Sequence, residues 1–152
     1  MTDLLQHVSM IGVNLIDNTS TVIECKGQRI ELGGIECRWI EEHYDVEEVT
    51  SLWKTDCFRI LLSHRPHWVD LYSKSQCDLV ICGHAHGGQW HIPFFDIPCA
   101  APQQGIFPKY TEGLMDLGRT KMLISRGLVR HYHGIPRLYN NPEIVIMDIR
   151  PE

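Results

Sequence analysis

"FRILLSHRPHWVDLYSKSQCDLVICGHAHGG", residues 58–88, is the stretch of sequence that decides the fold. It contains two short apolar runs rich in strand-forming residues, FRILLS and DLVIC, separated by a segment that opens with Pro66. Proline suits the first position of a helix, because its nitrogen carries no hydrogen that would need a partner there. The order strand, helix, strand favours a crossover between two parallel strands. We therefore predict an α/β fold with a mixed sheet.

Upstream of this stretch, a short turn that contains Gly27 separates residues 21–25 from residues 29–35. Glycine can adopt the positive φ of a tight turn, so the two segments are predicted to form a β-hairpin. Asp45 is a good N-cap residue, and apolar side chains at helical spacing follow it as far as Trp53. A short amphipathic helix is expected there.

Downstream, KMLIS (residues 121–125) and EIVIMDI (residues 143–149) are apolar enough to form two late strands. The segment from Pro93 to Gly118 holds four of the eight prolines and three of the twelve glycines. Such a composition predicts a long surface loop of the kind that often carries specificity.

Length and composition limit the possible functions. The 152 residues make one domain of ordinary size, and 14 basic against 19 acidic residues give a net charge of −5. Without a basic surface, nucleic acid is not an expected partner. The sequence offers neither a transmembrane segment nor a signal peptide, so a cytoplasmic protein is predicted. Its six cysteines never occur as C-x-x-C and are expected to be reduced structural thiols.

Three histidines follow the two central strands. His64 comes after FRILLS, and His84 and His86 come after DLVIC. Because ligands of open α/β sheets bind at the carboxyl ends of the strands, these imidazoles should meet at one edge. In an extended segment His84 and His86 would point the same way, toward one metal ion or two adjacent ions. The alternative is that they are polar loop residues; the third histidine and the neighbouring glycines favour a metal site.

The remaining candidates have a weaker basis in the sequence. Arg126 could bind phosphate through its planar guanidinium or form an ordinary surface salt bridge, and the sequence favours neither. Of the other six histidines, His131 and His133 are assigned to a solvated or substrate-facing loop. His67 and His91 are close to the proposed site in sequence and are assigned to a second layer around the metal. His7 and His43 are assigned to the surface.

The segments LLSHRP, GHAHGGQ, SRGL and NPEIVIMDI together resemble the C-terminal half of a calcineurin-like metallophosphoesterase, nearest to bacterial single-domain phosphodiesterases. The resemblance covers nearly the whole chain. It implies half of a β-sandwich flanked by helices, with His64 and His84 as ligands of one divalent metal ion and His86 as a ligand of the other. The expected metals are zinc, manganese, iron or nickel. The activity it implies in complete homologues is metal-dependent hydrolysis of phosphate esters at a dinuclear centre.

The motifs of that family's N-terminal half are absent. The sequence contains no Asp-x-His, no Gly-Asp and no Asn-His. Residues 1–152 are therefore expected to be the C-terminal portion of the domain without the N-terminal metal-binding half. The chain should hold at most one ion and be a weak or inactive phosphoesterase, and no catalytic residue is assigned. It is expected to pair with a second copy of itself or with a missing half.

Two other hypotheses remain. The chain could be a non-catalytic remnant that binds a metal or a partner through the same surface, or a plain α/β domain with structural histidines.

Overall fold

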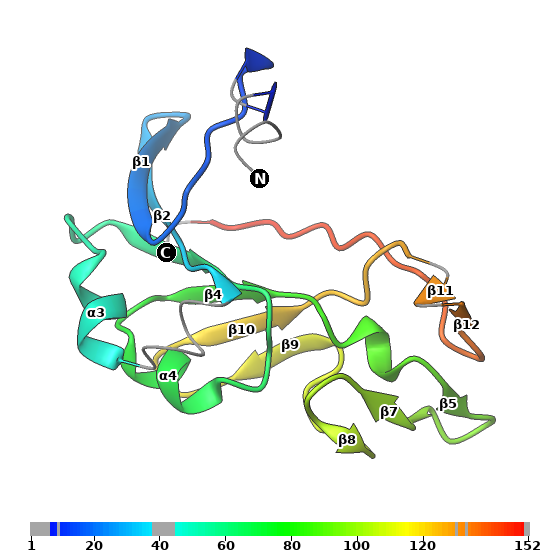
Figure 1. The fold of residues 1–152 in the computed structure, drawn as a ribbon. Coiled ribbons are helices and arrows are strands. Elements are labelled where there is room, and N and C mark those ends of the chain that lie inside the picture. Colours follow the sequence, from blue (N-terminus) through cyan, green and yellow to red (C-terminus); the bar gives the residue numbers. More distant parts are fainter. Residues whose placement is uncertain (1–6, 9, 38–44, 130, 133, 151–152) are drawn as a thin grey trace.

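A six-stranded mixed sheet forms the centre of the molecule (Figure 1). The computed structural model describes residues 7–8, 10–37, 45–129, 131–132 and 134–150. The strands follow the order β1-β2-β3-β4-β10-β9 across the sheet. Their bounds are β1 Thr19–Cys25, β2 Gln28–Gly34, β3 Phe58–Leu62, β4 Leu79–Cys82, β9 Gly113–Asp116 and β10 Lys121–Ile124. The prediction of an α/β fold with a mixed sheet is confirmed.

Strands β1 and β2 form the predicted hairpin. They pair antiparallel from Thr19 opposite Gly34 to Cys25 opposite Gln28. The two turn residues, Lys26 and Gly27, both have positive φ, at 51° and 76°. This is the backbone that matches the right-handed twist of a two-residue hairpin.

Two short helices connect the parallel strands β2, β3 and β4. Helix α3 (Val46–Ser51) is capped by Asp45, whose carboxylate accepts a hydrogen bond of 2.8 Å from the Glu47 nitrogen. Helix α4 (Val69–Lys74) begins three residues after Pro66, so the proline precedes the helix rather than opening it. The crossover from β3 through α4 to β4 is confirmed.

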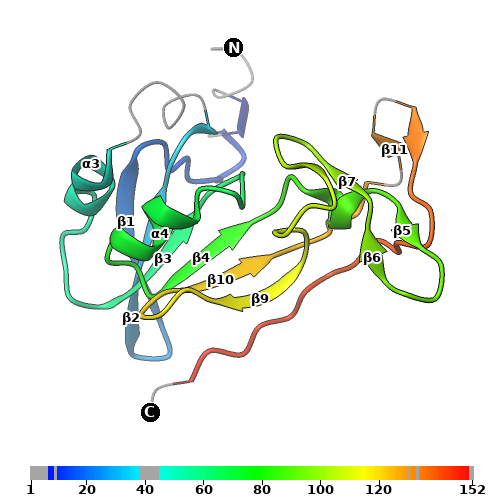
Figure 2. The same cartoon turned by 90° about the horizontal axis from the view of Figure 1, so that it is seen from below.

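The main core lies between the helices and one face of the sheet. Val49 of α3 and Leu71 of α4 are fully buried there, against Leu61, Val80 and other side chains that alternate along the strands. Full burial of an aliphatic side chain contributes about 1.5–3 kcal/mol, so this layer supplies much of the stability. Figure 2 shows α3 and α4 together on this side of the sheet.

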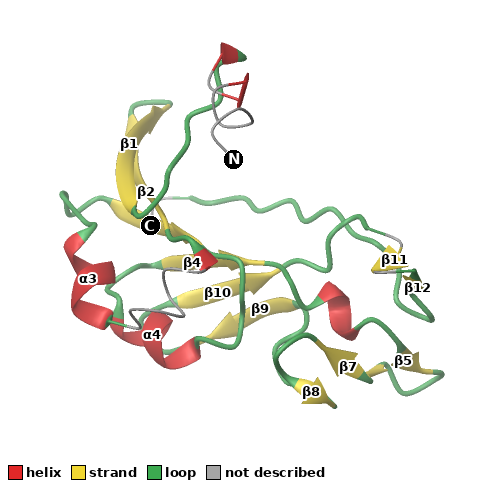
Figure 3. Cartoon of the chain, viewed as in Figure 1, coloured by secondary structure: helices red, strands yellow, loops and turns green. Residues whose placement is uncertain are grey.

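The opposite face carries a thinner cover. Its buried residues are Ile60, Leu79 and Leu123, and an extended C-terminal segment, residues 141–150, runs along it (Figures 1 and 2). Figure 3 draws this segment as a loop along its whole length. The prediction of a strand at residues 143–149 is therefore wrong, because the segment is extended but joins no ladder among the described residues. The second layer of a sandwich stays a prediction.

Residues 93–118 are more regular than the predicted surface loop. They contribute β9 to the sheet and several two-residue strands, which with the 3₁₀ turn η1 gather beyond the carboxyl ends of β4 and β10 (Figure 1). The short strands within residues 93–118 are β6 Ile97–Pro98, β7 Ala100–Ala101 and β8 Gly105–Ile106. Outside that range, η1 spans His86–Gly88, and the other short strands are β5 His91–Ile92, β11 His131–Tyr132 and β12 Ile135–Pro136. The short strands lie around the loop that carries His84 and His86.

All six cysteines are free thiols, of which Cys77 and Cys82 are buried and Cys25 is exposed. Among the described residues, no helix has the length and apolar character needed to cross a membrane.

Candidate functional site

His64 and His84 occupy equivalent positions at the ends of two adjacent parallel strands. Each lies two residues beyond the end of its strand, β3 or β4, and the Gly83 nitrogen donates a hydrogen bond of 3.1 Å to the His64 carbonyl. The Tyr72 hydroxyl, fully buried in α4, donates to the Arg65 carbonyl at 2.5 Å and thereby anchors the His64 loop to the helix layer. The sheet and the helix together bring the two histidines to one edge, as predicted.

The two imidazoles contact each other directly. His64 Nε2 and His84 Nδ1 are 2.8 Å apart, and the ring planes are inclined by 63°. On its other side, His84 Nε2 contacts the side-chain oxygen of Gln103, which can only accept. His84 Nε2 therefore carries the hydrogen, and its Nδ1 directs a lone pair toward His64. In many proteins, a hydrogen bond from the ring nitrogen that does not bind the metal orients a metal-ligating histidine in this way.

The donor set fits part of a metal site. Two nitrogens bound to one tetrahedral zinc ion at about 2.0–2.1 Å lie roughly 3.4 Å apart, so a small separation of the rings from 2.8 Å would admit an ion. Within the described part of the chain, however, no group of three or more His, Cys, Asp or Glu side chains is close enough to hold a metal. His64 and His84 thus converge as two ligands, and His86 does not complete a set of three with them.

The electrostatics keep two of the three histidines neutral. Burial lowers the pKa of His64, and electrostatic repulsion from His84 and Arg65 lowers it further. Burial also lowers the pKa of His86, with Arg137, His84 and His64 adding to the effect. A neutral imidazole is the form that binds metal, so the cause of both shifts favours ligation near neutral pH.

The loop after β4 is not extended, and here the expectation from the sequence is wrong. His84, His86 and Gln89 have positive φ values of 65°, 51° and 55°, and Gly87 and Gly88 between them have 65° and 78°. The left-handed conformation costs a non-glycine residue about 1–2 kcal/mol. Three such residues within six positions need contacts that hold them in place.

Asn140 supplies the main such contact. It is buried, and its Nδ2 donates to the backbone carbonyl of His86 at 2.7 Å and to that of Gln89 at 3.3 Å. The fit is tight, because a Cβ on Gly87 would lie only 2.6 Å from Asn140 Oδ1. Arg137 donates from Nη1 to the same oxygen at 3.4 Å.

His91 holds the loop from its other side. Its side chain is almost completely buried, with Nε2 in contact with the Gly87 carbonyl and Nδ1 2.6 Å from Asp96 Oδ1. The prediction that His91 lies in a second layer around the site agrees with this contact. Neither Asn140 nor Gln103 lies in a local sequence pattern that would reveal a partner so far along the chain.

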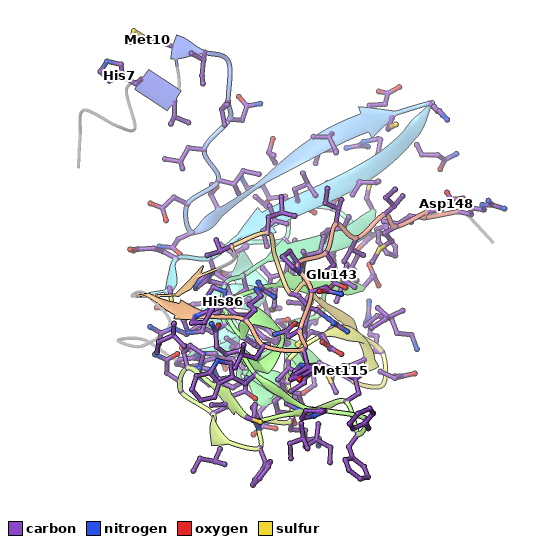
Figure 4. All side chains as sticks on the ribbon, turned by 90° about the vertical axis from the view of Figure 1, so that its right-hand side faces the viewer. His7, Met10, His86, Met115, Glu143 and Asp148 are labelled. Carbon is purple, nitrogen blue, oxygen red and sulfur yellow. The ribbon has the colours of Figure 1, made fainter. Side chains whose placement is uncertain are left out.

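The segment 135–140 as a whole is joined to the loop by further hydrogen bonds. The Gln89 side-chain nitrogen donates to the Ile135 carbonyl at 2.8 Å, and the Trp90 indole donates to the Pro136 carbonyl at 2.9 Å. In Figure 4 His86 lies near the orange β11–β12 strands, in agreement with these contacts. The loop is therefore positioned by residues that follow it by some 50 positions in sequence.

Arg126 forms salt bridges, which was one of its two predicted roles. Its guanidinium lies 2.5 Å from Glu112 Oε2 and 3.7 Å from Glu143 Oε2, and the Glu143 carboxylate also accepts from the Arg126 backbone nitrogen at 3.0 Å. With two carboxylates beside it, the positive charge is already balanced. The geometry favours a structural role over phosphate binding.

The other histidines lie in several different parts of the chain. The His67 ring packs beside that of Trp68, and His7 is exposed on the N-terminal segment, far from His86 in Figure 4. His43 and His133 fall outside the described residues, as does the side chain of His131.

Three curated proteins are similar to this chain. A protein of Escherichia coli (strain K12) named Phosphodiesterase YaeI is 27% identical over 138 residues, covering 91% of this chain and 48% of its own length. Uncharacterized metallophosphoesterase YkuE of Bacillus subtilis (strain 168) is 30% identical over 128 residues, 82% of this chain and 42% of its own length. Uncharacterized metallophosphoesterase Cj0846 of Campylobacter jejuni is 39% identical over 92 residues, 60% of this chain and 22% of its own length.

A sheet with histidines at its strand ends, together with these similarities, defines the class. The chain belongs to the calcineurin-like metallophosphoesterase family, as the sequence motifs predicted. It spans less than half the length of the curated relatives that it matches. No protein-family model matches the chain, and no solved structure matches it significantly. The name metallophosphoesterase, which two of these relatives carry, implies divalent metal ions as cofactors.

Proposed function

We propose that this chain is part of a metal-dependent phosphoesterase of the phosphodiesterase type, with His64 and His84 as ligands of one divalent ion and His86 as a ligand of another. The single observation that carries the proposal is the 2.8 Å approach of His64 Nε2 to His84 Nδ1. The two ring nitrogens come from adjacent strand ends and point at one another, which is the arrangement that two ligands of one ion need once the rings separate slightly. The similarity to a protein named phosphodiesterase supports the reaction class.

The roles of the residues follow from their contacts. His64 and His84 present nitrogens to the first ion, Gln103 orients His84, and Asn140 and His91 hold the backbone that carries His86. Zinc, manganese, iron or nickel would suit such nitrogen ligands. Ions bound there would polarise the phosphoryl oxygens of an ester and lower the pKa of a water molecule.

We further propose that residues 1–152 form the C-terminal portion of the catalytic domain and that the remaining ligands belong to an N-terminal half. Two observations support it: only two ligands converge among the described residues, and the second face of the sheet is only thinly covered. By itself the chain should therefore hold at most one ion.

Isothermal titration with zinc at pH 7.5 tests the metal site. We expect binding of at most one ion per chain, weakened about tenfold or more by His64→Ala and by His84→Ala, since each removes one of two converging ligands. His7→Ala is the matched control, because His7 is exposed and distant from the loop. Equal zinc binding by wild type and His84→Ala would contradict the proposal.

Hydrolysis of bis(4-nitrophenyl) phosphate with added manganese tests the division of the catalytic domain. We expect the chain alone to turn over no faster than its His84→Ala variant, because the other ligands are missing. Metal-dependent turnover that His84→Ala abolishes would show that this chain's own residues suffice.

A further inference from the structure

A pocket of about 360 Å³ opens beside His86. It lies between the η1 turn, strand β7 and strand β12. Its wall consists of one imidazole, one carboxamide and four apolar residues, which are His86, Gln89, Ala100, Ala101, Pro102 and Ile135. The volume is at the lower end of the range for pockets that bind small organic molecules.

The chemistry of the wall is apolar away from His86. No lining residue other than His86 can carry a charge. The nitrogen of the Gln89 carboxamide donates to the Ile135 carbonyl at 2.8 Å, so the polar groups that the wall offers a ligand are few. A sugar-like group with many hydrogen-bonding atoms would find too few partners here to replace its hydration, which disfavours its binding. The pocket therefore suits an apolar group of ring size.

Two residues of the pocket wall are close in sequence to the histidine pair and its partner Gln103. His86 lies on the wall, two residues after His84. Pro102, also on the wall, is followed by Gln103, whose side chain contacts His84 Nε2. A phosphate near the histidines can therefore place the organic group that it carries in this pocket.

We infer that the pocket binds the apolar or aromatic alcohol portion of a phosphate ester. The inference rests on the proposed phosphoesterase function and adds the substrate class to it. Phosphate groups contact the end that carries the histidines, and Ala100, Ala101 and Ile135 contact the organic group. Esters whose alcohol is small or charged gain nothing from these residues.

Binding of two phosphonates that differ only in their organic group tests the inference. With zinc present, phenylphosphonate should bind about tenfold or more tightly than methylphosphonate, because only the phenyl ring buries apolar surface. In a sample with labelled alanine and isoleucine methyl groups, phenylphosphonate should shift the NMR signals of Ala100, Ala101 and Ile135. Benzyl alcohol, which has no phosphorus, should shift the same signals.

A pocket-filling variant provides the comparison. Ala100 is exposed on the wall, so Ala100→Trp should occupy the pocket and remove the phenyl preference while zinc and methylphosphonate still bind. Ser73→Trp, an exposed position on α4, is the control and should change nothing. A phenyl preference that survives Ala100→Trp, or methyl signals that stay in place with benzyl alcohol, would overturn the inference and leave the metal site standing. If benzyl alcohol shifts the signals but neither phosphonate binds, both the inference and the proposed function fail.

Discussion

Among single residues, Asn140 has the most consequential contacts outside the histidine pair. It is buried beneath a strained loop, and it donates to the carbonyls of His86 and Gln89. Each carbonyl also accepts one longer backbone hydrogen bond of 3.3 Å, from the Gln89 and Leu138 nitrogens respectively. An amide donor is required at this position, because a carbonyl oxygen can only accept. Asn140 is therefore a positioning residue for the histidine loop.

Asn140→Asp should weaken zinc binding by about tenfold, within the range found when groups that orient metal ligands are changed. The variant keeps the shape of the side chain but places an oxygen opposite the carbonyl of His86. Titration calorimetry measures the affinity, and circular dichroism checks that the fold persists. Asn141→Asp is a matched control, since Asn141 is adjacent and exposed. Equal losses in the two variants would mean that added negative charge, not the lost donor, is responsible.

Glu31 is a second buried polar residue whose partners define its role. Its carboxylate accepts hydrogen bonds from the hydroxyls of Ser20 and Thr55 and from the backbone nitrogens of Lys54 and Thr55, at 2.7–3.0 Å. Burial raises the pKa of this carboxyl, but the hydrogen bonds outweigh burial and the net pKa is lowered. The charged form is thus the one that stabilises the fold.

Glu31→Gln should lower the free energy of unfolding by about 2–3 kcal/mol at pH 7, because one end of the amide would face donors with a donor of its own. Since the folded pKa lies below the ordinary value of about 4.3, the stabilisation is fully present above that pH and is lost as pH falls through the folded pKa. Urea unfolding at pH 7 and pH 3 measures the difference, which should shrink at pH 3. Glu24→Gln, exposed on β1, is the control.

At the scale of elements, local pattern predicted the hairpin, α3, β3, β4 and β10, because each has its own turn, cap or apolar run. It failed where pairing depends on distant partners. Residues 143–149 have the composition of a strand, yet no neighbouring strand offers them a ladder in the described structure. Likewise the order of the strands placed His64 and His84 together, whereas the left-handed backbone at His86 depends on Asn140, which no local pattern connects to it.

Amide hydrogen exchange should distinguish the C-terminal segment from the sheet. We expect amides of residues 144–149 to exchange quickly, because they form no ladder, and those of Met122 and Leu123 in the interior strand β10 to exchange slowly. Mass spectrometry of peptic fragments measures both in one sample. Strong protection of residues 144–149 would mean that this segment pairs with a strand in solution.

At the scale of the whole molecule, the two faces of the sheet differ in cover. The helix face is closed, whereas on the other face Phe58 and Leu62 are each 38% exposed and Leu114 is 62% exposed. Burying such side chains lowers the free energy, so this face favours association with another chain. The same face would receive the missing half of the domain that we propose.

We expect the chain alone to form a dimer or larger oligomer through this face. Light scattering should give a mass above the 17.6 kDa of one chain, and Leu114→Lys should shift the population toward monomer. Leu128→Lys is the matched control, because Leu128 is equally exposed at 62% but lies in a loop outside the sheet. A monodisperse wild-type monomer at high concentration would contradict this expectation.

The left-handed backbone at His84, His86 and Gln89 also determines when the arrangement of the loop is established. Its conformational free energy is incurred once, as the chain folds and Asn140 and His91 close around the loop. The backbone of the loop then keeps its conformation on encounter with a ligand, and only the rings of His64 and His84 need to separate slightly. The rate of ligand binding at the histidine loop would therefore be set by diffusion and by the ligand's loss of water. The loop would be a preorganised binding site rather than one that forms around its ligand.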